Sequence, residues 1–236
     1  MTILREHTSI QFDIELKAVT SSVLHMGELV QQQFQLAMEY LNDGGTALSA
    51  RVRDLGYQVN SMEVDIDRKC HLLLAQRQPE ANDLRTILTA LKCTTDIERI
   101  GDQAELIVRR AEMLFQRNEL SLTQPCELAR SASMASSMLH NALQAFARSD
   151  MEIATQVIRQ DTQVNEEYSH ITRNLIEHMT ENPQTITAGL DILFMAKAIE
   201  RIGDHAKNMA EYIIFMVKGS DVRHTSVETL PRQENL

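Results

Sequence analysis

The chain has 236 residues, of which 43% are hydrophobic and 24% charged, and its formal net charge at pH 7 is -10. This is the composition of a globular chain with one large or two small domains, and its negative charge argues against nucleic acid as a partner. Glycine, proline and aromatic residues are scarce and tryptophan is absent, so the sequence predicts an all-α protein.

No apolar run approaches the roughly 18 residues that a membrane-spanning helix needs, and the densest run, residues 212–217, is much shorter. The N-terminal segment lacks the apolar core of a signal peptide. We therefore expect a cytoplasmic location by elimination. The cysteines Cys70, Cys93 and Cys126 are widely spaced and form no CxxC pair, which predicts reduced thiols in the core.

Three helices are predicted in the first half of the chain, over about residues 12–42, 46–78 and 82–118. Apolar residues recur in alternating steps of four and three along the first of them, which is typical of an amphipathic helix. The first helix stops at a Gly-Gly pair, Thr46 is a suitable N-cap for the second, and Pro79 separates the second from the third.

The same pattern begins again after residues 119–125, the best candidate for a linker. Helices are predicted over about residues 125–148, 151–180 and 184–218, and Ser149-Asp150 offers a cap for the middle one. We expect two three-helix repeats followed by a polar, mobile tail. The predicted limits are 1–118 for the first repeat, 126–219 for the second and 220–236 for the tail.

A pentapeptide occurs twice at matched places in the two halves: Glu-Arg-Ile-Gly-Asp fills residues 98–102 and again 200–204. Outside it, Val59-Asn60 aligns with Val164-Asn165. A period near one hundred residues is too long for a solenoid repeat, so one duplication of a half-domain is the simplest interpretation. The expected architecture is a pair of tandem, pseudo-symmetric three-helix bundles built from six long helices.

Each pentapeptide places two acids four residues apart, which puts both carboxylates on one helix face within about 6 Å. The pairs are Glu98 with Asp102 and Glu200 with Asp204. Because these faces continue apolar stripes, the carboxylates are expected to point toward packed regions. Buried carboxylates without partners are costly, so paired cations or a metal ion are implied.

The glycine of the pentapeptide supports a close approach at this face. Glycine inside a helix costs about 1 kcal/mol relative to alanine, so its presence needs a compensating reason. Gly101 lies on the acid face beside Asp102. We expect another helix or a ligand to come close to the backbone there.

A third acid pair, Glu63 and Asp67, is predicted to join the site of the first half, with His71 one further turn along. The fifth helix has Tyr168 and Thr172 at the matching positions, so the second site is weaker on sequence grounds. Acids on neighbouring turns offer substitutes: Asp161, Glu166 and Glu167.

Three other interpretations remain open. The acids form ordinary salt bridges with Arg99, Arg201 or other cations on a solvated face. They belong to a metal-free interaction module, in which cations or protonation relieve their repulsion. Or they build a carboxylate-bridged di-metal enzyme, which would draw on Glu-x-x-His from two helices, a pair that the chain does not supply. Nucleotide-binding and serine-hydrolase motifs are also missing, so we expect no enzyme.

Taken together, the doubled pentapeptide, Pro79 with Asn-Asp-Leu-Arg at 82–85, and Val-Lys-Gly at 217–219 resemble the PhoU family. The resemblance covers residues 7 to about 224. It implies two three-helix bundles related by a pseudo-twofold axis, usually associated as homodimers or larger oligomers. It also implies metal binding through Glu98, Asp102, Glu200 and Asp204.

In function, the resemblance implies a negative regulator of phosphate uptake and of the phosphate-starvation response. Members of the family are thought to connect the ATPase of the phosphate ABC transporter with a membrane sensor histidine kinase. Carboxylate oxygens suit hard divalent or trivalent ions, with Fe, Mn, Mg and Zn as candidates. Phosphate itself would be repelled by such a cluster, so any phosphate sensing is expected to be indirect.

Overall fold

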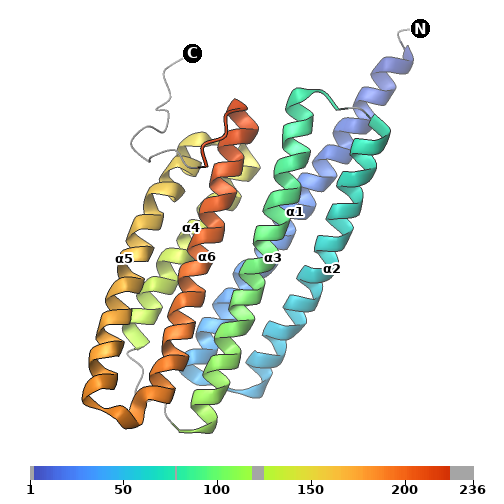
Figure 1. Cartoon of the computed structure of the whole chain (residues 1–236). Helices are drawn as coiled ribbons and strands as arrows, with labels where there is room; N and C mark the ends of the chain where they lie inside the picture. Colours follow the sequence, from blue (N-terminus) through green and yellow to red (C-terminus); the bar gives the residue numbers. More distant parts are fainter. Residues whose placement is uncertain (1–2, 78, 119–124, 224–236) are drawn as a thin grey trace.

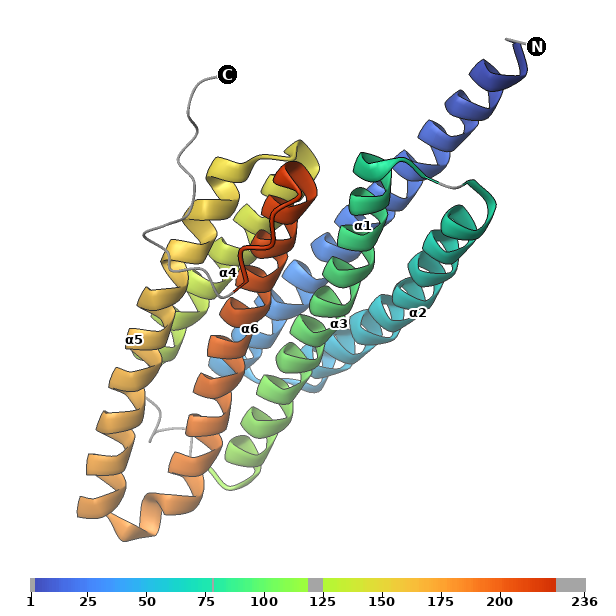
Figure 2. The ribbon, with the colours of Figure 1, turned by 45° about the horizontal axis from the view of Figure 1, so that its top comes forward.

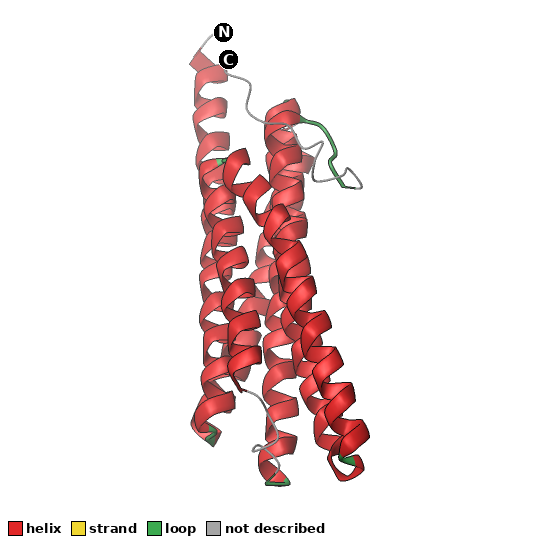
Figure 3. Ribbon diagram, turned by 90° about the vertical axis from the view of Figure 1, so that its left-hand side faces the viewer, coloured by secondary structure: helices red, strands yellow, loops and turns green. Residues whose placement is uncertain are grey.

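Six long α-helices make up the computed structural model, which describes residues 3–77, 79–118 and 125–223 (Figure 1). Every regular element in that part of the chain is helical, which confirms the all-α prediction (Figure 3). A 3-10 turn, η2 (Pro183–Thr185), separates the last two helices. The helices are α1 (Ile3–Asp43), α2 (Thr46–Arg77), α3 (Ala81–Gln116), α4 (Pro125–Arg148), α5 (Met151–Glu181) and α6 (Ile186–Lys218).

Local signals set most of the helix ends. The Asp150 carboxylate accepts hydrogen bonds from the backbone N–H groups of Glu152 and Ile153 at 2.9 and 3.1 Å, as its predicted capping role requires. Gly219 adopts a left-handed conformation, φ 75°, and its N–H donates to the carbonyl of Phe215, so α6 stops where predicted. The predicted cap of α2 is wrong by one residue, because Thr46 is already helical.

Two helix starts differ from the prediction. α1 begins at Ile3 instead of Phe12, because no breaker precedes Phe12 and good helix formers continue the helix without an apolar stripe. Its first turns extend beyond α2 and α3 (Figure 2). α3 begins at Ala81, with Glu80 at the N-cap position and no side-chain cap. The predicted linker, residues 119–125, ends on Pro125, which is already the first residue of α4. Residues 119–124 and most of the predicted tail, 224–236, lie outside the described residues, so the predicted domain limits stay predictions.

The two repeats meet through α3 and α6, which form the most extensive helix pair in the chain and lie side by side in Figure 1. The Thr89 hydroxyl donates to the Tyr212 carbonyl, and Arg110 donates to Asp191, so the two helices run in opposite directions. α1 and α4 form a second, smaller contact between the repeats. An antiparallel pair of equivalent helices is what a pseudo-twofold axis between two repeats produces.

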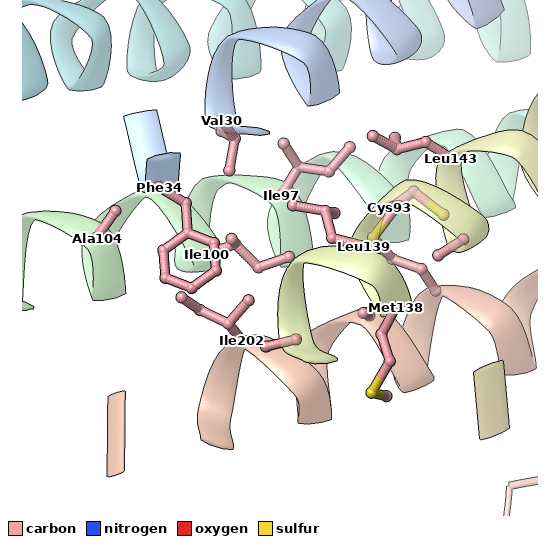
Figure 4. Packing of buried hydrophobic residues seen from close by; sticks show 14 of the residues in the cluster. Val30, Phe34, Cys93, Ile97, Ile100, Ala104, Met138, Leu139, Leu143 and Ile202 are labelled. Atoms are coloured by element: carbon pink, nitrogen blue, oxygen red, sulfur yellow. The ribbon is translucent and has the colours of Figure 1, made fainter. Parts of the chain in front are cut away.

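One continuous hydrophobic core joins the two repeats. Figure 4 shows side chains from four helices gathered in it, among them Phe34 of α1, Ile100 of α3, Leu139 of α4 and Ile202 of α6. Each is almost completely buried. Burying such a side chain stabilises a fold by about 1.5–3 kcal/mol, so this shared core couples the two bundles into one folding unit.

Two of the three cysteines lie in the core as free thiols, as predicted. Burial raises the pKa of Cys70 to about 11 and raises that of Cys93 further. The side chain of Cys126 lies outside the described residues. Among the described helices, none has the length and apolar character that a membrane-spanning segment needs.

Candidate functional site

The acids of the first repeat lie on neighbouring parts of α2 and α3. We call them the first acid face: Glu63, Asp67, Glu98, Asp102 and Glu105. Glu63, Glu98 and Glu105 are half-buried, whereas Asp67 and Asp102 are exposed. The expectation that the carboxylates point into a packed region is therefore wrong for Asp102. α3 packs through its apolar positions such as Ile97 and Ile100, and the acids lie beside that stripe.

These carboxylates repel one another. Burial, and then the charges of Asp67 and Asp102, raise the pKa of Glu63. Burial, and then Asp102 and Glu63, raise the pKa of Glu98. Burial and Asp102 also raise the pKa of Glu105. The charged forms of three neighbouring acids are thus disfavoured at one place, which a bound cation would relieve.

No lysine or arginine forms an ion pair with the first acid face within the described part of the chain. Among the described residues its one charged contact joins Nδ1 of His71 to Oδ2 of Asp67 at 3.3 Å, and both side chains are more than half exposed. Arg99, which the salt-bridge interpretation invoked, is exposed and acts on Glu98 and Glu63 only through its more distant charge.

A buried glutamine lies directly behind this face. Gln33 of α1 is fully buried, its Nε2 donates to the Val52 carbonyl at 3.1 Å, and its Oε1 has no hydrogen-bond partner. A Cβ on Gly101 would lie 2.9 Å from that Oε1. The predicted close approach at Gly101 is confirmed, and the approaching element is α1. Sequence reasoning assigned no role to Gln33.

A second missing Cβ accommodates one of the acids. A Cβ on Gly56 of α2 would lie 1.9 Å from Oε1 of Glu105 and 3.1 Å from Nε2 of Gln33. Glu105 therefore rests against the α2 backbone at a place where no other residue type would fit without movement.

The acids of the second repeat have a different environment. We call Asp161 of α5 with Glu200 and Asp204 of α6 the second acid face. Nζ of Lys197 lies 2.6 Å from the carboxylate of Glu200, and Nζ of Lys207 lies 2.8 Å from Oδ2 of Asp161. Asp161 and Glu200 are buried, and Asp204 is half-buried. Two of the three acids are therefore paired, as the salt-bridge interpretation requires, but the partners are lysines instead of Arg201 and the paired acids are buried instead of solvated.

Asp204 makes no ion pair with the residues that the structure describes, but it lies close to the same charges. Burial, and then the charges of Glu200 and Asp161, raise its pKa, whereas Lys197 and Lys207 lower it. Asp161 also accepts a hydrogen bond from Nδ2 of Asn165 at 3.2 Å. Of the three substitutes considered from the sequence, Asp161 is the one that the structure brings next to the pentapeptide helix.

The other two candidate acids of α5 do not join this face as ligands. Glu166 is exposed, and the buried Glu167 pairs with Arg130 at 3.3 Å. Glu167 also opens the one Glu-x-x-His motif of the chain, which ends at His170. Nε2 of His170 lies near Asn174 at 3.2 Å. The motif thus has other partners, and a second copy, as a di-metal site requires, does not occur in the sequence.

A buried polar cluster between α3 and α6 was missed entirely. Nδ1 of His205 lies 2.7 Å from Oδ1 of Asp96, and Nδ2 of Asn208 donates to the same oxygen at 3.3 Å. Burial and the Asp96 carboxylate raise the pKa of Tyr212 to about 12. Asp96 lies just before one pentapeptide and His205 just after the other. Their places beside the repeated segment were the signal in the sequence that could have identified this cluster.

Within the described residues, no group of three or more His, Cys, Asp and Glu side chains is arranged so that it could hold a metal ion. The predicted metal sites therefore stay predictions. The first acid face fits a metal in its donor chemistry, because its oxygen ligands lack an internal cation. Its side chains would have to turn toward a common point to bind one.

The model of the PhoU domain matches the chain twice, over residues 23–111 and 128–213. The chain belongs to the PhoU family. The two matches correspond to the two three-helix repeats and confirm that the fold is a tandem duplication. Together they span most of the described helices.

Members of the PhoU family similar to this chain include proteins of nearly the same length. A Burkholderia protein, called phosphate-specific transport system accessory protein PhoU homolog, is 42% identical over 98% of this chain and 99% of its own length. The Escherichia coli K12 phosphate-specific transport system accessory protein PhoU is 39% identical over 97% of this chain and 94% of its own length.

Solved PhoU structures have the same fold. The crystal structure of PhoU from Pseudomonas aeruginosa matches with a TM-score of 0.85 at 41% identity, over 89% of this chain and all of that one. The phosphate transport system regulatory protein PhoU from Streptococcus pneumoniae matches with a TM-score of 0.80 at 24% identity, which shows the shared fold alone.

Proposed function

We propose that this chain is a cytoplasmic regulatory adaptor of phosphate homeostasis that restrains phosphate uptake. The observation that carries the proposal is similarity at about 40% identity over nearly the whole length to accessory proteins of the phosphate-specific transport system. Its long helices offer extended surfaces for contact with other proteins. The proposed partners are the ATPase of the phosphate ABC transporter and a phosphate-sensing histidine kinase.

The proposed action is contact without chemistry. An adaptor of this kind binds one state of the transporter more tightly than the other and so shifts the population between them. The proposed homodimer would present the binding surface twice. Static light scattering of the purified chain tests the dimer, which predicts twice the monomer mass of 26.8 kDa.

Binding of the purified chain to the transporter ATPase tests the adaptor role. The two proteins are expected to associate in biolayer interferometry and to co-elute on gel filtration. A matched control is an unrelated ABC-transporter ATPase at the same concentration. Equal binding to both ATPases, or to neither, would overturn the proposed contact.

We also propose that the first acid face binds a divalent or trivalent metal ion, with Glu63, Asp67, Glu98 and Asp102 as ligands. Raised pKa values of Glu63 and Glu98 support this, since mutual repulsion is what a cation would relieve. When bound, the metal would supply positive charge that holds α2 and α3 together at this face. It is proposed as a structural ion and takes part in no reaction.

Elemental analysis of protein purified without chelator tests this site. Metal is expected in the wild type and reduced in the Glu98→Gln, Asp102→Asn variant. Equal metal content in the wild type and the variant would show that Glu98 and Asp102 are not metal ligands. A protein free of metal even after supply of Fe, Mn, Mg and Zn would favour the second candidate, a metal-free helical interaction module. The lysine pairs of the second acid face are the observation that favours that candidate.

A further inference from the structure

We infer that the second repeat carries its own cations: the ammonium groups of Lys197 and Lys207 stand where an external metal ion would otherwise be needed. External metal binding is then confined to the first acid face. The inference deepens the proposed metal site by assigning it to one half of a duplicated structure. It rests on a comparison of equivalent positions in the two repeats.

The first difference between the repeats is a pair of residues where α3 packs against α2, and where α6 packs against α5. With α3 and α6 aligned on the pentapeptide, Lys207 is equivalent to Glu105; with α2 and α5 aligned on their Val-Asn pairs, Asp161 is equivalent to Gly56. The first repeat thus places a carboxylate against a bare backbone. The second repeat places an ammonium 2.8 Å from a buried carboxylate at the same point.

The second difference lies nearer the helix start. Lys197 is equivalent to Thr95, and Tyr168 is equivalent to Glu63. Nζ of Lys197 lies 5.2 Å from the centre of the Tyr168 ring and 2.6 Å from the Glu200 carboxylate. An aromatic ring in place of an acid supports the lysine through a cation–π contact. One acid of the first acid face is therefore replaced by a residue that helps to hold an internal cation.

The two faces consequently differ in charge. Five carboxylates form the first acid face, and none of them pairs with a lysine or arginine in the described part of the chain. The second acid face has three carboxylates and two lysines, so one negative charge is left uncompensated. Arg99 and Arg201 occupy equivalent positions in the two pentapeptides and are both exposed, so they add the same charge to each face and do not change the difference between the faces.

A metal ion at the second acid face would meet two obstacles. Each ammonium group already pairs with one of the carboxylates that would bind the ion, Lys197 with Glu200 and Lys207 with Asp161, and such charge-assisted hydrogen bonds are stronger than neutral ones. The ion would also be repelled by both lysines at short range in a partly buried site. Binding of the ion by Glu200 and Asp161 would require both lysines to leave these carboxylates.

Calorimetric titration of the chelator-treated protein with Mn²⁺ tests the inference. Mn²⁺ binding by the wild type should be lost in Glu98→Gln, Asp102→Asn and kept in Glu200→Gln, Asp204→Asn. The Lys197→Met, Lys207→Met variant should gain an additional Mn²⁺, and that gain should disappear when Glu200→Gln and Asp204→Asn are added. Arg201→Met removes one positive charge from the same helix and should gain nothing.

Loss of wild-type Mn²⁺ binding in Glu200→Gln, Asp204→Asn would overturn the inference. So would a well-folded lysine variant that gains no Mn²⁺. If the wild type binds no Mn²⁺ at all, the proposed metal site of the first acid face fails, and the lysine variant alone decides the inference.

A thermal double-mutant cycle covers the case in which the lysine variant does not fold. Lys207→Met and Asp161→Asn should each lower the Tm, and the double variant should lose less than the sum of the two. Additive losses would show that the pair is not coupled and would overturn the inference.

Discussion

Nδ1 of His205 lies 2.7 Å from Oδ1 of Asp96, and this contact crosses the boundary between the two repeats. Both side chains are almost fully buried. Asn208 donates to the same carboxylate oxygen at 3.3 Å. Because Asp96 belongs to α3 and both partners belong to α6, the cluster fixes how the two bundles are placed against each other.

Asp96→Ala should destabilise the protein by about 3 kcal/mol, because truncating one partner leaves a buried polar group without compensation. Urea unfolding followed by circular dichroism measures the change. Asp65→Ala is the matched control: Asp65 pairs with Arg68 at 3.0 Å, but the two side chains are 55% and 70% exposed. That variant should lose less than about 0.5 kcal/mol. Equal losses in the two variants would contradict the role given to Asp96.

Glu98→Gln should stabilise the metal-free protein at pH 7. The raised pKa of Glu98 means that the folded state favours its protonated form. Stability from this group is present below its ordinary pKa and is lost as the pH rises through the raised value. The glutamine variant avoids that loss, and screening limits its gain to at most about 1 kcal/mol.

The Tm of both proteins between pH 4.5 and 7.5, in chelator, checks this prediction. The advantage of Glu98→Gln should be largest at pH 7 and should vanish toward pH 4.5. A variant that is less stable than the wild type at pH 7 would show that the ionised carboxylate is favourable in the fold.

Gly203→Ala and Gly27→Ala should change stability in opposite directions. A Cβ on Gly203 would lie 3.4 Å from Cγ1 of Val164, an ordinary contact, so alanine should gain up to about 1 kcal/mol of helix propensity. A Cβ on Gly27 would lie 2.4 Å from Cδ2 of Leu143, where α1 meets α4. The Tm should rise in the first variant and fall in the second, by the equivalent of about 1–3 kcal/mol. A change of Tm in the same direction in both variants would contradict the conclusion that there is room for a Cβ at Gly203 but not at Gly27.

The core thiols should be unreactive in the native protein. In a Cys126→Ser background, Ellman's reagent at pH 8 should label neither Cys70 nor Cys93, because both are buried and their raised pKa values suppress the thiolate. Both should react after unfolding in guanidinium chloride, which is the internal control. Rapid labelling of the native protein would show that the core opens readily.

Much of the fold is predictable because local chemistry sets it. Gly44 and Gly45, with φ of 65° and 105°, end α1 as the Gly-Gly signal predicted, and Asp150 caps α5. The start of α1 was missed because its first turns have no apolar stripe for periodicity to detect. The exposure of Asp102 was missed because helical spacing predicts which residues share a helix face, but not how far that face lies from the neighbouring helix.

The candidate site is predictable only in part. The spacing of the pentapeptide identified Glu98, Asp102, Glu200 and Asp204 as paired acids on α3 and α6. It did not show that lysines pair with one face only, since Lys207 and Asp161 are 46 residues apart. Contacts between helices depend on how those helices pack, and a linear pattern does not contain that information.

The rate of radiolabelled phosphate uptake in phosphate-rich medium tests the central claim most directly. Cells that lack the chain are compared with cells that express it. The account predicts faster uptake without the chain and a return to the lower rate when the wild type is restored. An uptake rate that is the same with and without the chain would contradict its role as a restraint on phosphate transport.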